Sequence, residues 1–153
     1  MTKYVDFLTT TGPYGPFSNF SRHPVTLRGL TFATSEHCYQ WHKLLRVNDD
    51  GTFVESPEQR MIREAKTPYE AKQIAYRYKS AWDTRWDEKK FDIMYEICLA
   101  KATQHDIIGK LLRSTGDATI REVSRKDPVW GIGPDGQGQN LLGKIWMLVR
   151  NSI

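Results

Sequence analysis

The sequence predicts a helix-rich α+β domain with a small β-sheet, and three observations favour this fold class. The segment after Trp86 carries apolar residues at intervals of three or four, as an amphipathic helix does. Two hydroxyl residues followed by proline mark further helix starts, and the strand-like runs are few and short. With 153 residues, 39% hydrophobic and 26% charged, the chain has the composition of one globular domain spanning 1–153.

The first third of the chain is expected to combine turns, a hairpin and one helix. Residues 12–20 alternate glycine and proline with aromatic residues, which is typical of a turn-rich segment. Apolar residues on both sides of Arg28-Gly29 predict a short hairpin. A helix then begins at 34–36, where a hydroxyl residue can cap it, and extends to about Leu45.

The middle of the chain predicts three more helices. Ser56-Pro57 opens a short one with a cap and a proline in its first turn. The capping-box pattern at 67–70 begins another, which runs to about Lys79. The periodic segment that follows Trp86 extends through Ala102 and predicts the third.

The last third is expected to contain two helices, a strand and an unusual loop. Residues 105–113 predict a helix and residues 118–124 a strand. A glycine-rich loop occupies 131–138. The C-terminal helix is expected over 141–151, with Asn140 as its cap.

Charge and cysteine content exclude several classes of protein. Twenty-two lysines and arginines against 18 acidic residues give a net charge of +4, which suits an anionic ligand, but the basic residues form no stripe for nucleic-acid readout. Two cysteines in helical segments predict no disulfide framework and a reducing, cytoplasmic location. No apolar run approaches the ~20 residues that span a bilayer, and residues 1–6 lack the apolar segment of a signal peptide.

Glu36, Gln40 and Lys43 fall on one face of the predicted helix, because they are four and three residues apart. A carboxylate and an ammonium so placed can serve as an acid–base group and its electrophilic partner in a cleft. A solvated polar face with a weak ion pair would give the same spacing. His37 and His42 are five residues apart and point in different directions, so no zinc site is predicted.

The segment 127–140 is the most unusual in the chain. Its glycines would let backbone N–H groups approach an anion, and it leads into a helix N-terminus, where the dipole favours phosphate. Its spacing fits neither a P-loop nor a dinucleotide-binding fingerprint, and a tight surface connection is the simpler alternative. Three tryptophans lie near aspartates: Trp82 near Asp83, Trp86 near Asp87 and Trp130 near Asp127. Such pairs bind a base and a ribose, or form core and helix cap, and Asp87 is expected to be a cap.

Several motifs together resemble the YbiA/NADAR family. The chain carries Ser-Asn-Phe at 18–20, TSEHCYQWHK at 34–43 and WGIGPDGQGQNLLG at 130–143. The resemblance extends from about residue 7 to residue 150. It implies a YbiA-like single domain with N-glycosidase activity, which is hydrolysis of the bond between ribose C1′ and an amine nitrogen.

The site residues of that family carry over to matching positions. The resemblance implies that Glu36 stabilises positive charge on the ribose or activates water, and that Asp127 binds ribose hydroxyls or is the second carboxylate. Attack by the Lys43 amine on C1′ of a ring-opened ribose is an alternative. The residues expected to bind substrate are Asn19, Arg22, Gln40, Trp86, Trp130, Gly131, Gly133, Gly138 and Asn140.

The implied substrate is a phosphorylated ribosyl-amine. It is either ADP-ribose on a guanine base, possibly within nucleic acid, or a phosphoribosylamino-pyrimidine intermediate of riboflavin synthesis. We expect no metal, cofactor, membrane or obligate protein partner. Two other hypotheses are a module that binds ADP-ribose without cleaving it and a structural or RNA-binding domain. The carboxylate–lysine set favours the enzyme over the module, and the dispersed basic residues disfavour RNA binding.

Overall fold

The computed structural model describes residues 3–153, which form six α-helices, two short 3₁₀ helices and four short strands. This content confirms the predicted helix-rich α+β class. Met1 and Thr2 lie outside the described residues. They are the first two residues of the predicted domain and of the segment 1–6, which was expected not to be a signal peptide. No helix within residues 3–153 is long and apolar enough to cross a membrane.

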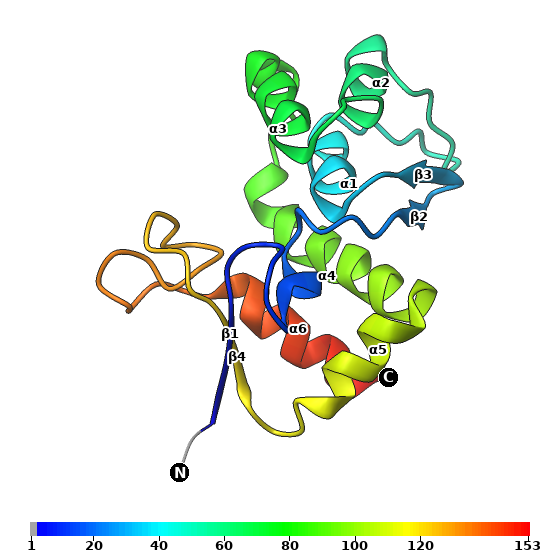
Figure 1. Ribbon diagram of the computed structural model, residues 1–153. Coiled ribbons are helices and arrows are strands. Elements are labelled where there is room, and N and C mark those ends of the chain that lie inside the picture. The colour runs from blue at the N-terminus through cyan, green and yellow to red at the C-terminus, as the bar shows by residue number, and fades with distance from the viewer. Residues whose placement is uncertain (1–2) are drawn as a thin grey trace.

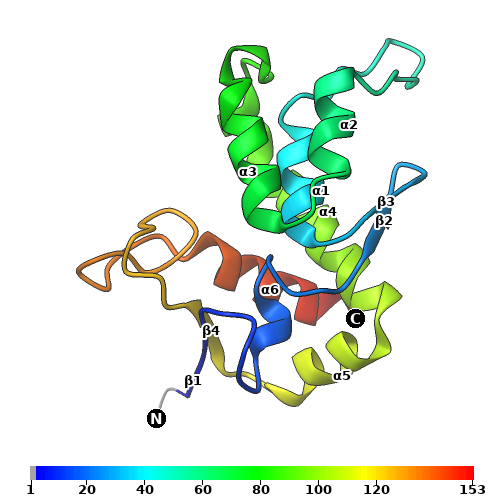
Figure 2. The ribbon, with the colours of Figure 1, turned by 45° about the horizontal axis from the view of Figure 1, so that its top comes forward.

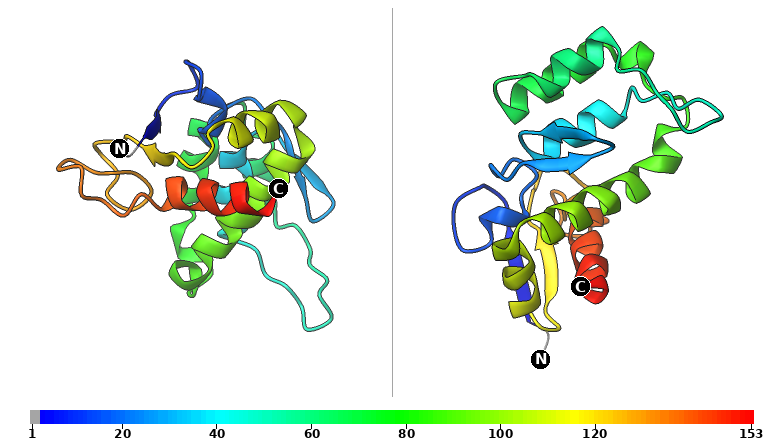
Figure 3. Two further views of the ribbon diagram at one scale, coloured as in Figure 1. Left: turned by 90° about the horizontal axis from the view of Figure 1, so that it is seen from below. Right: turned by 90° about the vertical axis from the view of Figure 1, so that its right-hand side faces the viewer.

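The helices fall into two groups that meet at α4. They are α1 (Ser35–His42), α2 (Pro57–Arg63), α3 (Pro68–Arg77), α4 (Trp86–Gln104), α5 (Asp106–Ser114) and α6 (Leu141–Ser152). Helices α1, α2 and α3 pack on one another above α4, while α5 and α6 contact α4 from the other side (Figures 1, 2 and 3). Helix α4 therefore links the two groups, and α1 contacts it directly.

Two separate two-stranded sheets accompany the helices. β2 (Val25–Leu27) and β3 (Leu30–Phe32) are antiparallel and confirm the predicted hairpin. β1 (Tyr4–Phe7) and β4 (Thr119–Glu122) are parallel, with Phe7 opposite Glu122, and β4 packs on α6. The strand at 118–124 is thus confirmed within two residues at each end, whereas β1 was not predicted.

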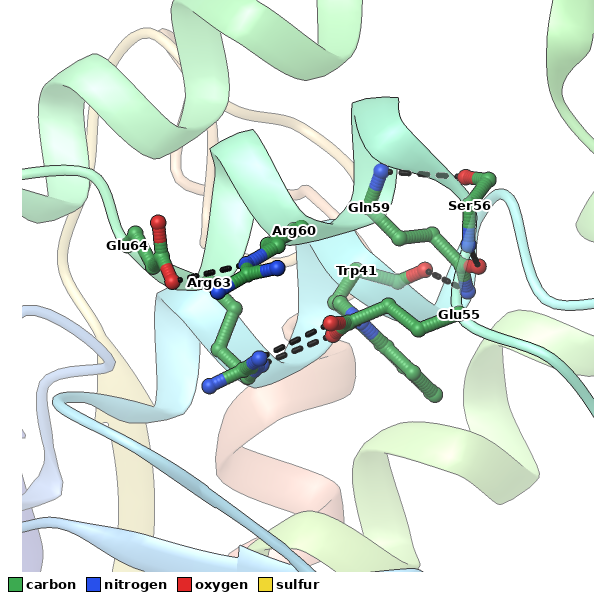
Figure 4. A network of polar contacts seen from close by, with 7 residues as sticks. All are labelled: Trp41, Glu55, Ser56, Gln59, Arg60, Arg63 and Glu64. Atoms are coloured by element: carbon green, nitrogen blue, oxygen red, sulfur yellow. Dashed lines mark hydrogen bonds and ion pairs between the residues drawn. The ribbon is translucent and has the colours of Figure 1, made fainter.

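Local capping signals set the helix starts. The Thr34 hydroxyl accepts a hydrogen bond from the backbone N–H of His37 and begins α1, and Ser56 and Gln59 form a reciprocal capping box that begins α2 (Figure 4). The Thr67 hydroxyl likewise caps α3. The box expected there is not closed, because the Glu70 carboxylate accepts from the N–H of Lys66 instead.

Several predicted boundaries and caps need correction. Helix α1 ends at His42 rather than near Leu45, and α3 ends at Arg77 rather than Lys79, where a 3₁₀ turn follows. Asp87 lies inside the first turn of α4 and caps nothing, because Arg85 occupies the N-cap position without a side-chain bond. Asn140 stands at the N-cap of α6, but its side chain makes no capping bond to the helix.

A mostly buried ion pair connects α2 to α1. Arg63 donates two hydrogen bonds of 2.7 and 2.8 Å to the Glu55 carboxylate, which also accepts one of 2.8 Å from the indole N–H of Trp41 (Figure 4). Trp41 is fully buried on the core side of α1. The network therefore fixes the rotation of α1 about its own axis. The face of α1 opposite Trp41 is then the one that can contact a ligand.

Candidate active site

A cavity of about 450 Å³ lies where the α1–α3 group meets α4, β4 and the loop after β4. It is lined by Leu8, Thr9, Thr10, Ser18, Asn19, Phe20, Glu36, Tyr39, Gln40, Lys43, Lys72, Tyr76, Met94, Glu122, Asp127 and Trp130. Figure 1 shows the elements that supply this lining, with α1 and α3 above and β4 with its following loop below and to the left. The volume is that of a site for one nucleotide-sized ligand.

Helix α1 supplies the most polar wall of the cavity. Glu36, Gln40 and Lys43 line it together, as their spacing predicts, and all three are at most 8% exposed. They are not the solvated polar face that was the alternative. All eight residues of α1 are buried, because the opposite side of this helix packs into the core.

Glu36 is a buried carboxylate with one hydrogen-bond donor. The Gln40 side-chain N–H donates to its Oε1 at 2.7 Å. Burial raises the pKa of Glu36, since the ionised form loses water, and this effect is opposed by the Gln40 bond and by the charges of Lys43 and Lys72. The pKa of Glu36 therefore lies above that of an exposed glutamate, and perturbed carboxyls of this kind are common in active sites.

Lys43 lies inside a cage of aromatic rings. Its Nζ is 5.1, 4.6 and 4.1 Å from the ring centres of Tyr39, Tyr76 and Trp82. Burial lowers the pKa of Lys43 to about 8, while the charge of Glu36 acts in the opposite direction. At neutral pH this amine is thus a cation that can lose its proton within the physiological range.

The facing wall comes from β4 and the loop that follows it. The Asp127 Oδ1 accepts hydrogen bonds of 2.9 Å from the backbone N–H groups of Val129 and Trp130, a local turn that fixes the Trp130 ring. That ring meets Tyr39 edge-on, with centres 5.5 Å apart. Burial, with the nearby charges of Asp127 and Glu36, raises the pKa of Glu122 to about 7.

Three acceptor atoms in the lining have no hydrogen-bond partner within residues 3–153. They are Oδ1 of Asn19, Oε1 of Gln40 and Oε2 of Glu122. A buried acceptor without a donor is costly, and such atoms in native proteins point to a missing partner. These oxygens are enclosed within the wall, and they make it a polar surrounding for a ligand.

The model of the NADAR domain matches residues 6–153.

The chain belongs to the NADAR family.

Relatives and a solved structure agree with this assignment. The chain is 30% identical to N-glycosidase YbiA of Escherichia coli over 97% of this chain and 88% of that protein. It is 37% identical to an N-glycosidase of Nostoc punctiforme over 92% and 86% of the two chains. A riboflavin biosynthesis protein of Zea mays is 32% identical over 99% of this chain but 25% of its own length. The NMR structure of E. coli YbiA superposes with a TM-score of 0.84, covering 99% of this chain and 86% of that one.

Of the residues that the sequence assigned to the site, this NADAR chain brings six into the cavity lining. They are Asn19, Glu36, Gln40, Lys43, Asp127 and Trp130. Six others do not line it: Arg22, Trp86, Gly131, Gly133, Gly138 and Asn140. Trp86 is buried, and its ring centre lies 5.2 Å from that of Tyr39, so it packs behind the cavity wall; its contact with substrate stays a prediction.

The glycines of the 131–138 loop serve close packing of the chain on itself. A Cβ on Gly138 would lie 2.6 Å from the carbonyl oxygen of Gly131, and Gly133 has a left-handed φ of +72°. The N–H groups of Gly133 and Gly138 donate to the carbonyls of Ser124 and Ile132. Because these groups are already used, the loop does not present the expected phosphate cradle, and its contact with substrate stays a prediction.

Two charged residues of the lining were not assigned from the sequence. Lys72 lies one turn before Tyr76 on α3, and this i, i+4 spacing is the signal that places both on the cavity side. Glu122 ends a strand whose pairing is long-range, so no local pattern points to its role. Within residues 3–153 no group of three or more His, Cys, Asp or Glu could hold a metal ion.

Proposed function

We propose that this protein is an N-glycosidase that hydrolyses the bond between ribose C1′ and an amine nitrogen of a phosphorylated substrate. The observation that carries the proposal is the buried Glu36 carboxyl, placed with Lys43 and Lys72 in a cavity that also holds unpartnered acceptors. The names of the E. coli and Nostoc relatives, both N-glycosidases, support it.

Glu36 performs the central step. Breaking the C1′–N bond places positive charge on the ribose ring, and a fixed carboxylate in a dry site lowers the energy of that charge. The same carboxylate can take a proton from the water that attacks C1′. Gln40 orients Glu36 by its 2.7 Å hydrogen bond.

The other lining groups bind the substrate. The Trp130 and Tyr39 rings offer faces and edges to a planar base. Asn19 and Gln40 line the cavity and offer their side-chain amides to ribose hydroxyls or to the base. Lys72 adds a positive charge for the phosphate of either candidate substrate, ADP-ribosyl-guanine or a phosphoribosylamino-pyrimidine. The name of the Zea mays relative favours the riboflavin intermediate.

A second route for the same bond cleavage uses Lys43 as a nucleophile. Its support is the lowered pKa of about 8, because desolvation is one way in which proteins activate lysine amines. The amine would attack C1′ of the ring-opened sugar, and Glu36 would then move the protons. The two routes differ in whether a covalent adduct forms.

Mass spectrometry of products tests the proposal. ADP-ribosyl-guanosine and a phosphoribosylamino-pyrimidine are each incubated with the wild-type protein. We expect one of them to release its amine, guanosine or the aminopyrimidine, together with its ribose part, ADP-ribose or ribose phosphate. Calorimetry on the same ligands measures binding in parallel. If a ligand binds while both bonds survive, the protein is a binding module and the enzyme assignment is wrong.

A further inference from the structure

Glu122 is a partly buried residue that lines the cavity and has one enclosed, unpartnered oxygen. It is the last residue of β4, and its Oε2 has no hydrogen-bond partner within residues 3–153. An ionised carboxylate here loses hydration at this oxygen without gaining a donor. A neutral carboxylic acid fits the site better, because it carries no charge that has to be desolvated.

The backbone around Glu122 is fixed from two sides. Its N–H donates to the Asn140 side-chain oxygen at 3.0 Å, and its carbonyl accepts from the N–H of Ile132 at 3.0 Å. The Asn140 amide N–H also donates to the Ile120 carbonyl at 2.9 Å. Asn140 adopts a left-handed φ of 51°, which directs its side chain at β4 instead of at α6. The Glu122 side chain is therefore presented from a rigid strand end.

Glu36 and Glu122 differ in their hydrogen-bond donors and in the cations near them. Burial raises the pKa of both carboxyls, and the charge of Asp127 raises it further. Glu36 also accepts a hydrogen bond from Gln40 and lies near the positive charge of Lys43, and both favour its ionised form. The Oε2 of Glu122 has no donor within residues 3–153, and Lys72 is the cation that opposes the rise in its pKa. Glu36 is therefore the better base of the two, and Glu122 the better acid.

We infer that Glu122 is the general acid of the site and gives its proton to the nitrogen that leaves C1′. The inference rests on the proposed function and deepens it, because it names the second catalytic residue of the same cavity. The pKa of about 7 that burial and Asp127 give to Glu122 agrees with this role, since an acid is most useful near the working pH.

The proton and electron balance of the step is simple. The C1′–N bond breaks and its electron pair stays on nitrogen, while the Glu122 O–H bond breaks and its proton joins that nitrogen. The ribose is left with one positive charge near Glu36, and Glu122 becomes a carboxylate. Water then bonds to C1′ and gives up one proton to the pair of carboxylates, Glu36 and Glu122. This proton replaces the one that Glu122 lost, so no further reactant is needed.

The test compares Glu122→Gln with wild type on whichever substrate of the panel the wild type cleaves. Glu58→Gln changes a partly exposed glutamate of α2 that does not line the cavity, and it is the matched control. We expect wild-type kcat/KM to fall as pH rises above about 7, because the acid loses its proton. Glu122→Gln should lose roughly 100-fold or more in kcat and should lack this limb of the profile, with KM little changed.

The remaining outcomes separate the two proposals. If Glu122→Gln is as active as wild type, or keeps the limb near pH 7 at a lower rate, Glu122 is not the acid, although the N-glycosidase stands. If wild type releases no base from either substrate, the proposed function falls and the role of Glu122 falls with it. Carbon-13 NMR titration of the wild-type glutamate carboxyls, without substrate, needs no variant to fold. A Glu122 carboxyl that titrates near 4.5 would overturn the inference, and one near 7 supports it.

Discussion

The Nζ of Lys43 lies 4.1 Å from the centre of the Trp82 ring. Trp82 is held in place by its own indole N–H, which donates to the Ala75 carbonyl at 2.8 Å, and it meets Tyr76 edge-on. Trp82, and not Trp86, is therefore the tryptophan that touches the lysine of the site. Its ring favours the ammonium form of Lys43, while burial favours the neutral amine.

Replacing Trp82 by leucine should change the titration of Lys43. The substitution keeps an apolar cover but removes the ring, so the ammonium loses about 1 kcal/mol of cation–π stabilisation. We expect the pKa of Lys43 to fall below its value of about 8, as followed by NMR of its ε-carbon. Tyr4→Leu, an exposed ring on β1, is the control and should leave it unchanged. A Lys43 pKa that rises in Trp82→Leu would show that the ring acts by excluding water.

Reductive trapping separates direct hydrolysis from the lysine route. The wild-type protein is incubated with its substrate and cyanoborohydride near pH 7, where a lysine of pKa about 8 is mainly the ammonium. Direct hydrolysis predicts that intact-protein mass spectrometry finds no sugar adduct. A sugar adduct that maps to Lys43, and that is absent from Lys43→Arg, would show that the lysine amine attacks C1′ and that water does not.

Asn140→Gly tests whether Asn140 positions Glu122 or binds substrate. Glycine tolerates the φ of 51°, so the variant deletes the two side-chain hydrogen bonds to β4 and keeps the backbone path. We expect kcat to fall roughly tenfold with KM little changed, and the free energy of unfolding to drop by about 1–2 kcal/mol. Asn151→Gly, at the exposed end of α6, is the comparison. A raised KM with unchanged kcat would instead place Asn140 against the substrate.

Gly143→Ala should destabilise the fold, although alanine is the better helix former. A Cβ at this position in α6 would overlap the Ile120 carbonyl oxygen of β4 and the Asn140 amide. We expect a loss of about 3 kcal/mol in urea unfolding, the range of overpacked cores. Lys144→Ala, the exposed neighbour on the same helix, should change stability by less than about 0.5 kcal/mol. Equal stability of the two variants would mean that α6 can move away from β4 at little cost.

Local signals in the sequence were enough for most of the fold. Thr34, Ser56 and Thr67 each begin a helix where a hydroxyl residue precedes the periodic run. Of the β1–β4 pair, only the strand β4 was predicted. The two strands are parallel and about 115 residues apart in the sequence, as the Asp6–Arg121 contact shows. No local pattern encodes such a pairing.

In the candidate site too, the residues set by local patterns were predicted and those set by long-range contacts were not. The residues of α1 were found because helical spacing alone places Glu36, Gln40 and Lys43 on one face. Glu122 was missed, because it depends on the long-range strand pair. Asn140 was interpreted as a cap because of its position before a helix, and its left-handed backbone conformation turns the side chain elsewhere.

The most direct test of the account is the activity of Glu36→Gln beside Glu58→Gln on the substrate that wild type cleaves. Both variants exchange one carboxylate for an amide, but only Glu36 lines the cavity. We predict that Glu36→Gln folds, still binds the substrate and loses roughly 1,000-fold in kcat, while Glu58→Gln matches wild type. A folded Glu36→Gln whose kcat stays within about tenfold of wild type would contradict the central claim that this carboxylate drives cleavage of the C1′–N bond.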